Sequence, residues 1–189
     1  MKATIVIAAV LAAAAAVLLV LTGREVQRAP VELNPGGRPT ALVVFHPGLS
    51  DFPDSVVRAF ADGLVEQGWR VRLVAANADA PTDMAPFGLL ALAGPVYWWS
   101  PAPALTRYVR RAGDLHGTPV AVVLTGAGQG ERALGRMRRV VEQAHGKVVR
   151  SLAVYTLRPN DERLYGTVPN RRIAFDLARA AGAAIAPPP

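Results

Sequence analysis

The chain has 189 residues, 51% of them hydrophobic, which is enough for one domain with a sizeable core plus a short appendage. It contains no cysteine, which excludes disulfides, thiol redox chemistry and cysteine-ligated zinc. The three histidines lie far apart without metal-ligand spacing, which argues against a metal site, and the net charge of +7 favours anionic partners.

The first apolar stretch predicts a membrane-spanning helix. Residues 3–22 carry no charge, and a helix of that length spans about 30 Å, the thickness of a bilayer core. The alternative is a cleaved signal peptide, but that has a shorter apolar region and a small-residue cleavage site, whereas a charged run follows here. We therefore expect a transmembrane or signal-anchor helix over residues 1–23 and a single-pass, membrane-anchored protein. The flanking charges, Lys2 against Arg24 and Arg28, favour the cytoplasmic side for the folded domain.

Beyond this segment, a linker and then alternating strands and helices are predicted. Residues 24–39 contain Pro35-Gly36-Gly37, which is typical of a linker, and one domain is expected over 40–186. Apolar runs predict strands, and the amphipathic stretches between them predict helices. The expected strands cover 40–46, 69–75, 89–93, 119–125 and 147–157, and the expected helices cover 55–67, a stretch that opens at Ser100, 132–144 and 173–181. Five strands joined by crossovers imply a parallel sheet with helices on both faces, an α/β fold.

Large aromatic residues follow the third strand. Tyr97, Trp98 and Trp99 come just after the apolar run 89–93, in a loop with several prolines. Open α/β sheets bind ligands at the carboxyl ends of their strands, and flat rings favour a flat ligand. The alternative is that these rings fold back onto the core. A glycine-rich loop, 126–130, follows the fourth strand at the same end of the sheet.

This order of elements, with the blocks Gly94-Pro95-Val96-Tyr97-Trp98 and Val120 to Gly126, resembles the flavodoxin-like family. The resemblance covers residues 40–183. It implies a doubly wound sheet of strand order 2-1-3-4-5 that binds FMN noncovalently. In the family the loops after strands three and four flank the isoalloxazine ring, and the loop after strand one holds the phosphate. Carried over, the ring would contact Pro95, Val96, Tyr97, Trp98 and Trp99 on one side and Thr125, Gly126, Ala127, Gly128 and Gln129 on the other; the phosphate would contact Pro47, Gly48, Leu49, Ser50 and Asp51.

The phosphate loop departs from the family pattern. FMN-binding members usually have a hydroxyl-rich loop there, whereas Ser50 offers the one hydroxyl between His46 and Pro53. Pro47 lacks an N–H group, and Asp51 places a negative charge where a dianion would sit. An alternative role for Asp51 or Asp54 is to cap the first helix of the domain.

The sequence gives less support to hydrolysis, to dinucleotide binding and to nucleic-acid binding. His46, Ser50 and Asp51 lie within six positions of one loop, which excludes the geometry of a hydrolase triad, and the 126–130 loop lacks the spacing of a dinucleotide fingerprint. No DNA-binding motif accompanies the scattered arginines, so no nucleic-acid partner is expected.

The sequence therefore predicts a membrane-anchored, FMN-binding protein for electron transfer or oxidoreduction. The flavin would do the chemistry, with no catalytic side chain required. The expected partners are membrane lipid, through residues 3–22, and a quinone or a membrane redox protein. The competing hypothesis is a scaffold or binding module that keeps the flavodoxin-like sheet but has lost FMN.

Overall fold

The computed structural model describes residues 7, 20, 22–164 and 166–188. The predicted membrane segment, 3–22, lies almost entirely outside these residues. Within the described part of the chain, no helix combines the length and the apolar character needed to cross a bilayer.

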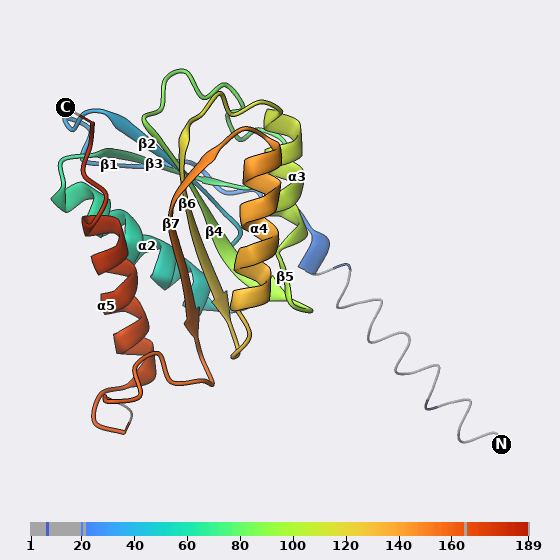
Figure 1. Ribbon diagram of the computed structural model, residues 1–189, viewed down its shortest axis with the longest axis vertical. Helices are drawn as coiled ribbons and strands as arrows, with labels where there is room; N and C mark the ends of the chain where they lie inside the picture. The colour runs from blue at the N-terminus through green and yellow to red at the C-terminus, as the bar shows by residue number, and fades with distance from the viewer. Residues whose placement is uncertain (1–6, 8–19, 21, 165, 189) are drawn as a thin grey trace.

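A mixed sheet forms the centre of the domain (Figure 1). Its parallel strands lie in the order β3-β2-β4-β6-β7, which is the predicted order 2-1-3-4-5. These strands are β2 (Thr40–Phe45), β3 (Arg70–Ala75), β4 (Leu89–Tyr97), β6 (Pro119–Gly126) and β7 (Lys147–Tyr155).

The predicted strand number is wrong, because the sheet has seven strands and not five. Strand β1 (Val31–Leu33) pairs antiparallel with β3 and comes from the region predicted as a linker. Strand β5 (Ser100–Pro101) pairs antiparallel with the end of β4. Strands of two or three residues are too short to produce a readable alternation of apolar and polar side chains.

Two pairs of helices cover the sheet, one pair on each face (Figure 1). Helices α2 (Asp51–Glu66) and α5 (Asn170–Ala183) lie on one face, and α3 (Pro103–Ala112) and α4 (Glu131–Gln143) lie on the other. Helix α2 begins four residues earlier than predicted. Its N-cap residue is Ser50, so Asp51 and Asp54 lie in the first turn and do not cap the helix.

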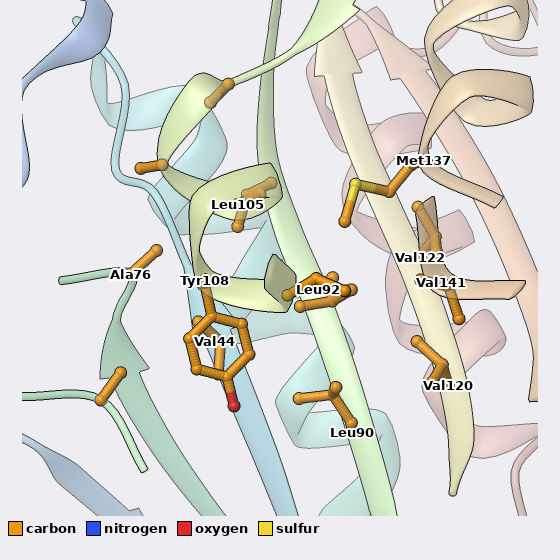
Figure 2. Packing of buried hydrophobic residues seen from close by; sticks show 14 of the residues in the cluster. Val44, Ala76, Leu90, Leu92, Leu105, Tyr108, Val120, Val122, Met137 and Val141 are labelled. Carbon is orange, nitrogen blue, oxygen red and sulfur yellow. The ribbon is translucent and has the colours of Figure 1, made fainter. Parts of the chain in front are cut away.

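The core forms two layers, because successive residues of a strand point to opposite faces of the sheet. Leu42 and Val44 of β2 pack toward α3 and α4, whereas Ala41 and Val43 pack toward α2 and α5. Figure 2 shows the first layer, in which α3 and α4 side chains meet strand residues. Its labelled members include Leu90, Leu92, Leu105, Tyr108, Val120, Val122, Met137 and Val141.

Helices α2 and α5 cross at two glycines. A Cβ atom on Gly63 would lie 2.0 Å from the carbonyl oxygen of Arg179, and one on Gly182 would lie 2.1 Å from that of Phe60. The two backbones are therefore in direct contact. This crossing fixes the position of α2, whose first turn follows the loop predicted to hold the phosphate.

Candidate functional site

The three predicted site loops and the loop after β7 lie at the carboxyl end of the parallel strands, where open α/β sheets bind ligands. Residues 46–50 follow β2, residues 98–99 follow β4, residues 127–130 follow β6, and residues 156–169 follow β7. We call this end of the molecule the carboxyl face.

Trp98 and Trp99 form the tip of a two-residue hairpin between β4 and β5. Tyr97 pairs with Ser100 below them, and both tryptophans have positive φ, 50° and 58°. Such turns normally take Asn-Gly, because bulky residues in the left-handed region cost about 1–3 kcal/mol each. Both indoles are exposed. The alternative that the rings fold back onto the core is therefore wrong for the two tryptophans but holds for Tyr97, which is half-buried and packs against the core.

The hairpin forms one wall of a cleft of about 480 Å³. This volume lies within the range of about 300–1,000 Å³ that is usual for small-molecule sites. The lining residues are Val96, Trp98, Trp99, Ala127, Gly128, Gln129, Leu157 and Arg158. The structure thus brings together six of the predicted ring-contact residues, three from each predicted wall.

The third side of the cleft was not predicted from the sequence. The amides of Leu157 and Arg158 both donate hydrogen bonds to the carbonyl of Ala127, at 3.0 and 3.1 Å, which ties the loop after β7 to the glycine-rich loop. The Arg158 guanidinium lies 5.4 Å from the centre of the Tyr155 ring and places a positive charge at the cleft. The position of these residues directly after a strand of the sheet is the signal that would have found them.

The other predicted ring-contact residues lie outside the cleft lining. Tyr97 turns toward the loop after β2, with its ring centre 6.3 Å from that of His46, and burial raises its pKa. Pro95 pairs with Thr125 in the sheet, and Gly126 lies against the side chain of Val96. The buried hydroxyls of Tyr97 and Thr125 find no hydrogen-bond partner among the described residues.

His46 organises the loop predicted to hold the phosphate. The amide of Gly48 donates to His46 Nδ1 at 3.0 Å, so Nε2 carries the proton and donates to the carbonyl of Arg24 at 3.1 Å. Burial lowers the pKa of His46 below its ordinary value of 6.5. A proton added at Nδ1 would face the Gly48 N–H group, so only the neutral ring makes both hydrogen bonds.

This arrangement predicts a loss of stability on mild acidification. As the pH falls below 6.5, the unfolded chain takes up the His46 proton before the folded protein does, so folding stability falls until the lower pKa of the folded state is passed. The slope is at most about 1.4 kcal/mol per pH unit. Urea unfolding between pH 7.5 and 5 should show a weaker dependence in His46→Gln than in the wild type. Equal dependence in the two proteins would contradict this role of His46.

The loop after β2 and the first turn of α2 do not fit a phosphate in the family's position. Pro47 has no N–H group, and that of Gly48 is used by His46. Asp51 and Asp54 place two carboxylates in the first turn of α2, which would repel a dianion. Asp51 pairs with Arg171, whose hydrogen bond lowers the pKa of Asp51, and Asp54 pairs with Arg28. The loop and the first turn of α2 therefore offer a phosphate little free positive charge and bring two carboxylates close to it.

Residues 22–30, here called the N-terminal arm, lie against the carboxyl face. Arg107 of α3 donates to the carbonyl of Gly23 at 2.7 Å, and Asn77 donates to the carbonyl of Val26 at 3.2 Å and to the side chain of Gln27 at 2.9 Å. This part of the predicted linker 24–39 is thus held by specific contacts, and β1 follows it directly. Nothing in the periodicity of the sequence indicated these contacts.

Comparisons with known proteins agree with this architecture. No protein-family model and no curated protein matches the sequence. Among solved structures, a flavodoxin from Streptococcus pneumonia TIGR4 has a TM-score of 0.57 at 16% identity, covering 77% of this chain and 98% of that chain. An azoreductase from Bacillus anthracis has a TM-score of 0.59 at 9% identity, covering 78% and 100%. An archaeal flavodoxin has a TM-score of 0.53 at 15% identity, covering 75% and 98%. The chain therefore has a flavodoxin-like α/β fold.

Proposed function

We propose that the protein binds a flavin, with the ring in the cleft between the β4–β5 hairpin and the loop after β6, and that it serves in electron transfer or oxidoreduction. The observation that carries this proposal is the pair of tryptophans at the hairpin tip. Two bulky residues are held in a costly backbone conformation with exposed rings, beside a cleft at the ligand-binding end of the sheet. Such strain is typical of functional sites, because selection for packing alone would remove it.

The cleft residues have distinct roles in this proposal. Trp98 or Trp99 stacks on the flat ring, and the backbone of residues 127–129 faces its polar rim. The positive charge of Arg158 favours the reduced, more negative form of the ligand and so raises its reduction potential. The flavin would supply the electron or hydride transfer, and the protein supplies binding, orientation and local charge.

Flavin retention by the full-length protein in detergent tests the proposal. Purified protein is mixed with FMN or riboflavin, desalted, and examined for a retained flavin absorbance band with quenched fluorescence. We expect retention of the ring with either compound. If neither is retained by folded protein, the flavin site is refuted and the scaffold hypothesis, which the carboxylates of the phosphate loop favour, takes its place.

A double variant of the hairpin tip separates function from stability. Trp98→Asn with Trp99→Gly matches the residues that such turns prefer and should stabilise the fold by about 1–2 kcal/mol by relieving the backbone. The same change should abolish flavin retention, because it removes the aromatic wall. Thermal unfolding and flavin retention are measured on the same samples. If the variant is less stable and binds no flavin, flavin retention by the wild-type protein is the deciding measurement. Full flavin retention by the variant would refute ring stacking.

We also propose that residues 3–22 anchor the protein in a membrane, with the domain on the cytoplasmic side and a quinone or membrane redox protein as electron partner. The length and lack of charge of this segment support the anchor. Full-length protein should stay with membranes through high-salt and carbonate washes. Truncation is best made before residue 22, because the N-terminal arm contacts the domain. Release by the washes, or a mature N-terminus beyond residue 22, would refute the anchor.

A further inference from the structure

Of the eight large apolar side chains that are exposed among the described residues of the domain, five lie on the carboxyl face. The most exposed is Leu157, at 81%, followed by Trp98 at 60% and Leu49 at 58%. Trp99 and Leu164 are exposed on the same face. These residues come from separate loops, after β2, after β4 and after β7, so their common location is a property of the fold and not of one segment.

The residues that directly follow the apolar N-terminal stretch contact this same face. The carbonyl of Arg24 accepts a hydrogen bond from His46, the residue that directly follows β2. The Arg107 side chain donates a hydrogen bond to the carbonyl of Gly23, the residue before Arg24. The uncharged residues 3–22 immediately precede these contacts. A bilayer that takes up residues 3–22 must therefore lie close to the carboxyl face.

The charges of the carboxyl face also suit a bilayer surface. Four of its carboxylates pair with arginines: Glu25 with Arg107, Asp51 with Arg171, Asp54 with Arg28, and Asp161 with Arg163. Arg158 follows Leu157 directly and contacts the Tyr155 ring. These four negative charges are thus offset, and an exposed arginine lies next to an exposed leucine. This is the combination that binds the interface of anionic membranes.

We propose that the carboxyl face docks onto the bilayer, with Trp98 and Trp99 at the headgroup boundary and Leu49 and Leu157 beside them. Tryptophan is enriched at that boundary, because its ring is apolar and its N–H group seeks a polar partner. The hairpin tip directs the rings of Trp98 and Trp99 outward, although their positive φ values are unfavourable. The docking rests on the proposed anchor but not on the flavin. It also directs the mouth of the cleft toward the membrane, so a ligand or electron partner would arrive from the lipid phase.

Tryptophan quenching in proteoliposomes tests the docking. Full-length protein is reconstituted into phosphatidylcholine and phosphatidylglycerol vesicles without flavin, with and without acyl chains that carry bromine. The chain has three tryptophans, and the third, Trp69, is 1% exposed with its indole N–H bonded to the carbonyl of Ile185. Brominated lipid should therefore quench Trp98 and Trp99 and spare Trp69, and aqueous acrylamide should quench little. Trp98→Phe and Trp99→Phe, which keep an apolar ring, assign the signal.

A matched pair of variants identifies the docking face. Leu157→Glu should lift the carboxyl face, so that quenching moves from brominated lipid to acrylamide. Val149→Glu changes another exposed apolar residue, near the opposite end of β7, and should have no effect. Protein that stays on the vesicles while acrylamide alone quenches Trp98 and Trp99, or equal effects of the two variants, would refute the docking. Release of the protein from the vesicles would refute the anchor and the docking together. Neither result decides the flavin proposal, which is judged by flavin retention in detergent.

Discussion

Replacing Gly182 by alanine is expected to lower the free energy of unfolding by about 3 kcal/mol. The added Cβ atom would lie 2.1 Å from the carbonyl oxygen of Phe60 and 3.0 Å from the amide nitrogen of Leu64. These are backbone atoms of α2, so no side chain can move aside, and α5 must shift away from α2. Gly63→Ala places its Cβ against the backbone of α5 and should have a similar effect. Because folded proteins are stable by only about 5–15 kcal/mol, such a loss is readily measured by urea unfolding.

Gly135→Ala is the matched control for this prediction. Gly135 also lies within a helix, α4, but an added Cβ would meet only the flexible end of Arg139, at 3.9 Å. Alanine is a better helix former than glycine, so this change should raise stability by about 0.5–1 kcal/mol. If the alanines at positions 63, 135 and 182 had the same effect, the close crossing of α2 and α5 would be disproved.

Replacing Asp51 by asparagine is expected to strengthen FMN binding about ten- to a hundredfold, if the phosphate lies at the loop after β2. The repulsion between a carboxylate and a phosphate about 6 Å apart is on the order of 1–3 kcal/mol per phosphate charge at an effective dielectric near 20. The change also releases Arg171 from its pair with Asp51 and leaves that positive charge for the phosphate. Riboflavin, which has no phosphate, should gain little.

Titration of both flavins into three proteins checks this expectation. Asp161→Asn is the control, because Asp161 is likewise paired with an arginine, Arg163, but lies in the loop before α5. Ser50 and not Asp51 is the N-cap of α2, so loss of the Asp51 charge leaves the cap residue in place. Equal FMN affinity in wild type and Asp51→Asn would mean that the phosphate of FMN lies elsewhere, with the ring in the cleft unaffected.

The parallel core of the fold could be predicted because its inner strands, β2, β4 and β6, are nearly continuous apolar runs. Runs such as 89–93 are buried on both faces by helices, and that burial is visible in composition alone. The outward position of Trp98 and Trp99 could not be predicted, since it depends on two positive φ values that a tryptophan pair does not favour. The short strands β1 and β5 gave no readable alternation.

Contacts between residues that lie far apart in the sequence could not be predicted either. The placement of Arg24 beside His46 joins residues that are 22 positions apart, and no local pattern encodes it. The same is true of Gly63 and Gly182, whose contact depends on which helices cross. The meeting of Val96, Trp98 and Trp99 with residues 127–129 at one cleft could be predicted for a simpler reason. Neighbouring parallel strands end at the same side of the sheet, so residues that follow them are brought together whatever the details of packing.

The two outer strands of the sheet differ from the inner ones in a way that bears on self-association. Strand β1 has only three residues, and β7 contains an irregularity where Val120 pairs with Val148 but Ala121 pairs with Arg150, leaving Val149 as an extra residue. Short outer strands, bulges and basic side chains such as Lys147 and Arg150 all hinder a second chain from adding a strand. Copies of this chain would therefore resist joining their sheets into a continuous ribbon, and the domain would remain free to meet other proteins.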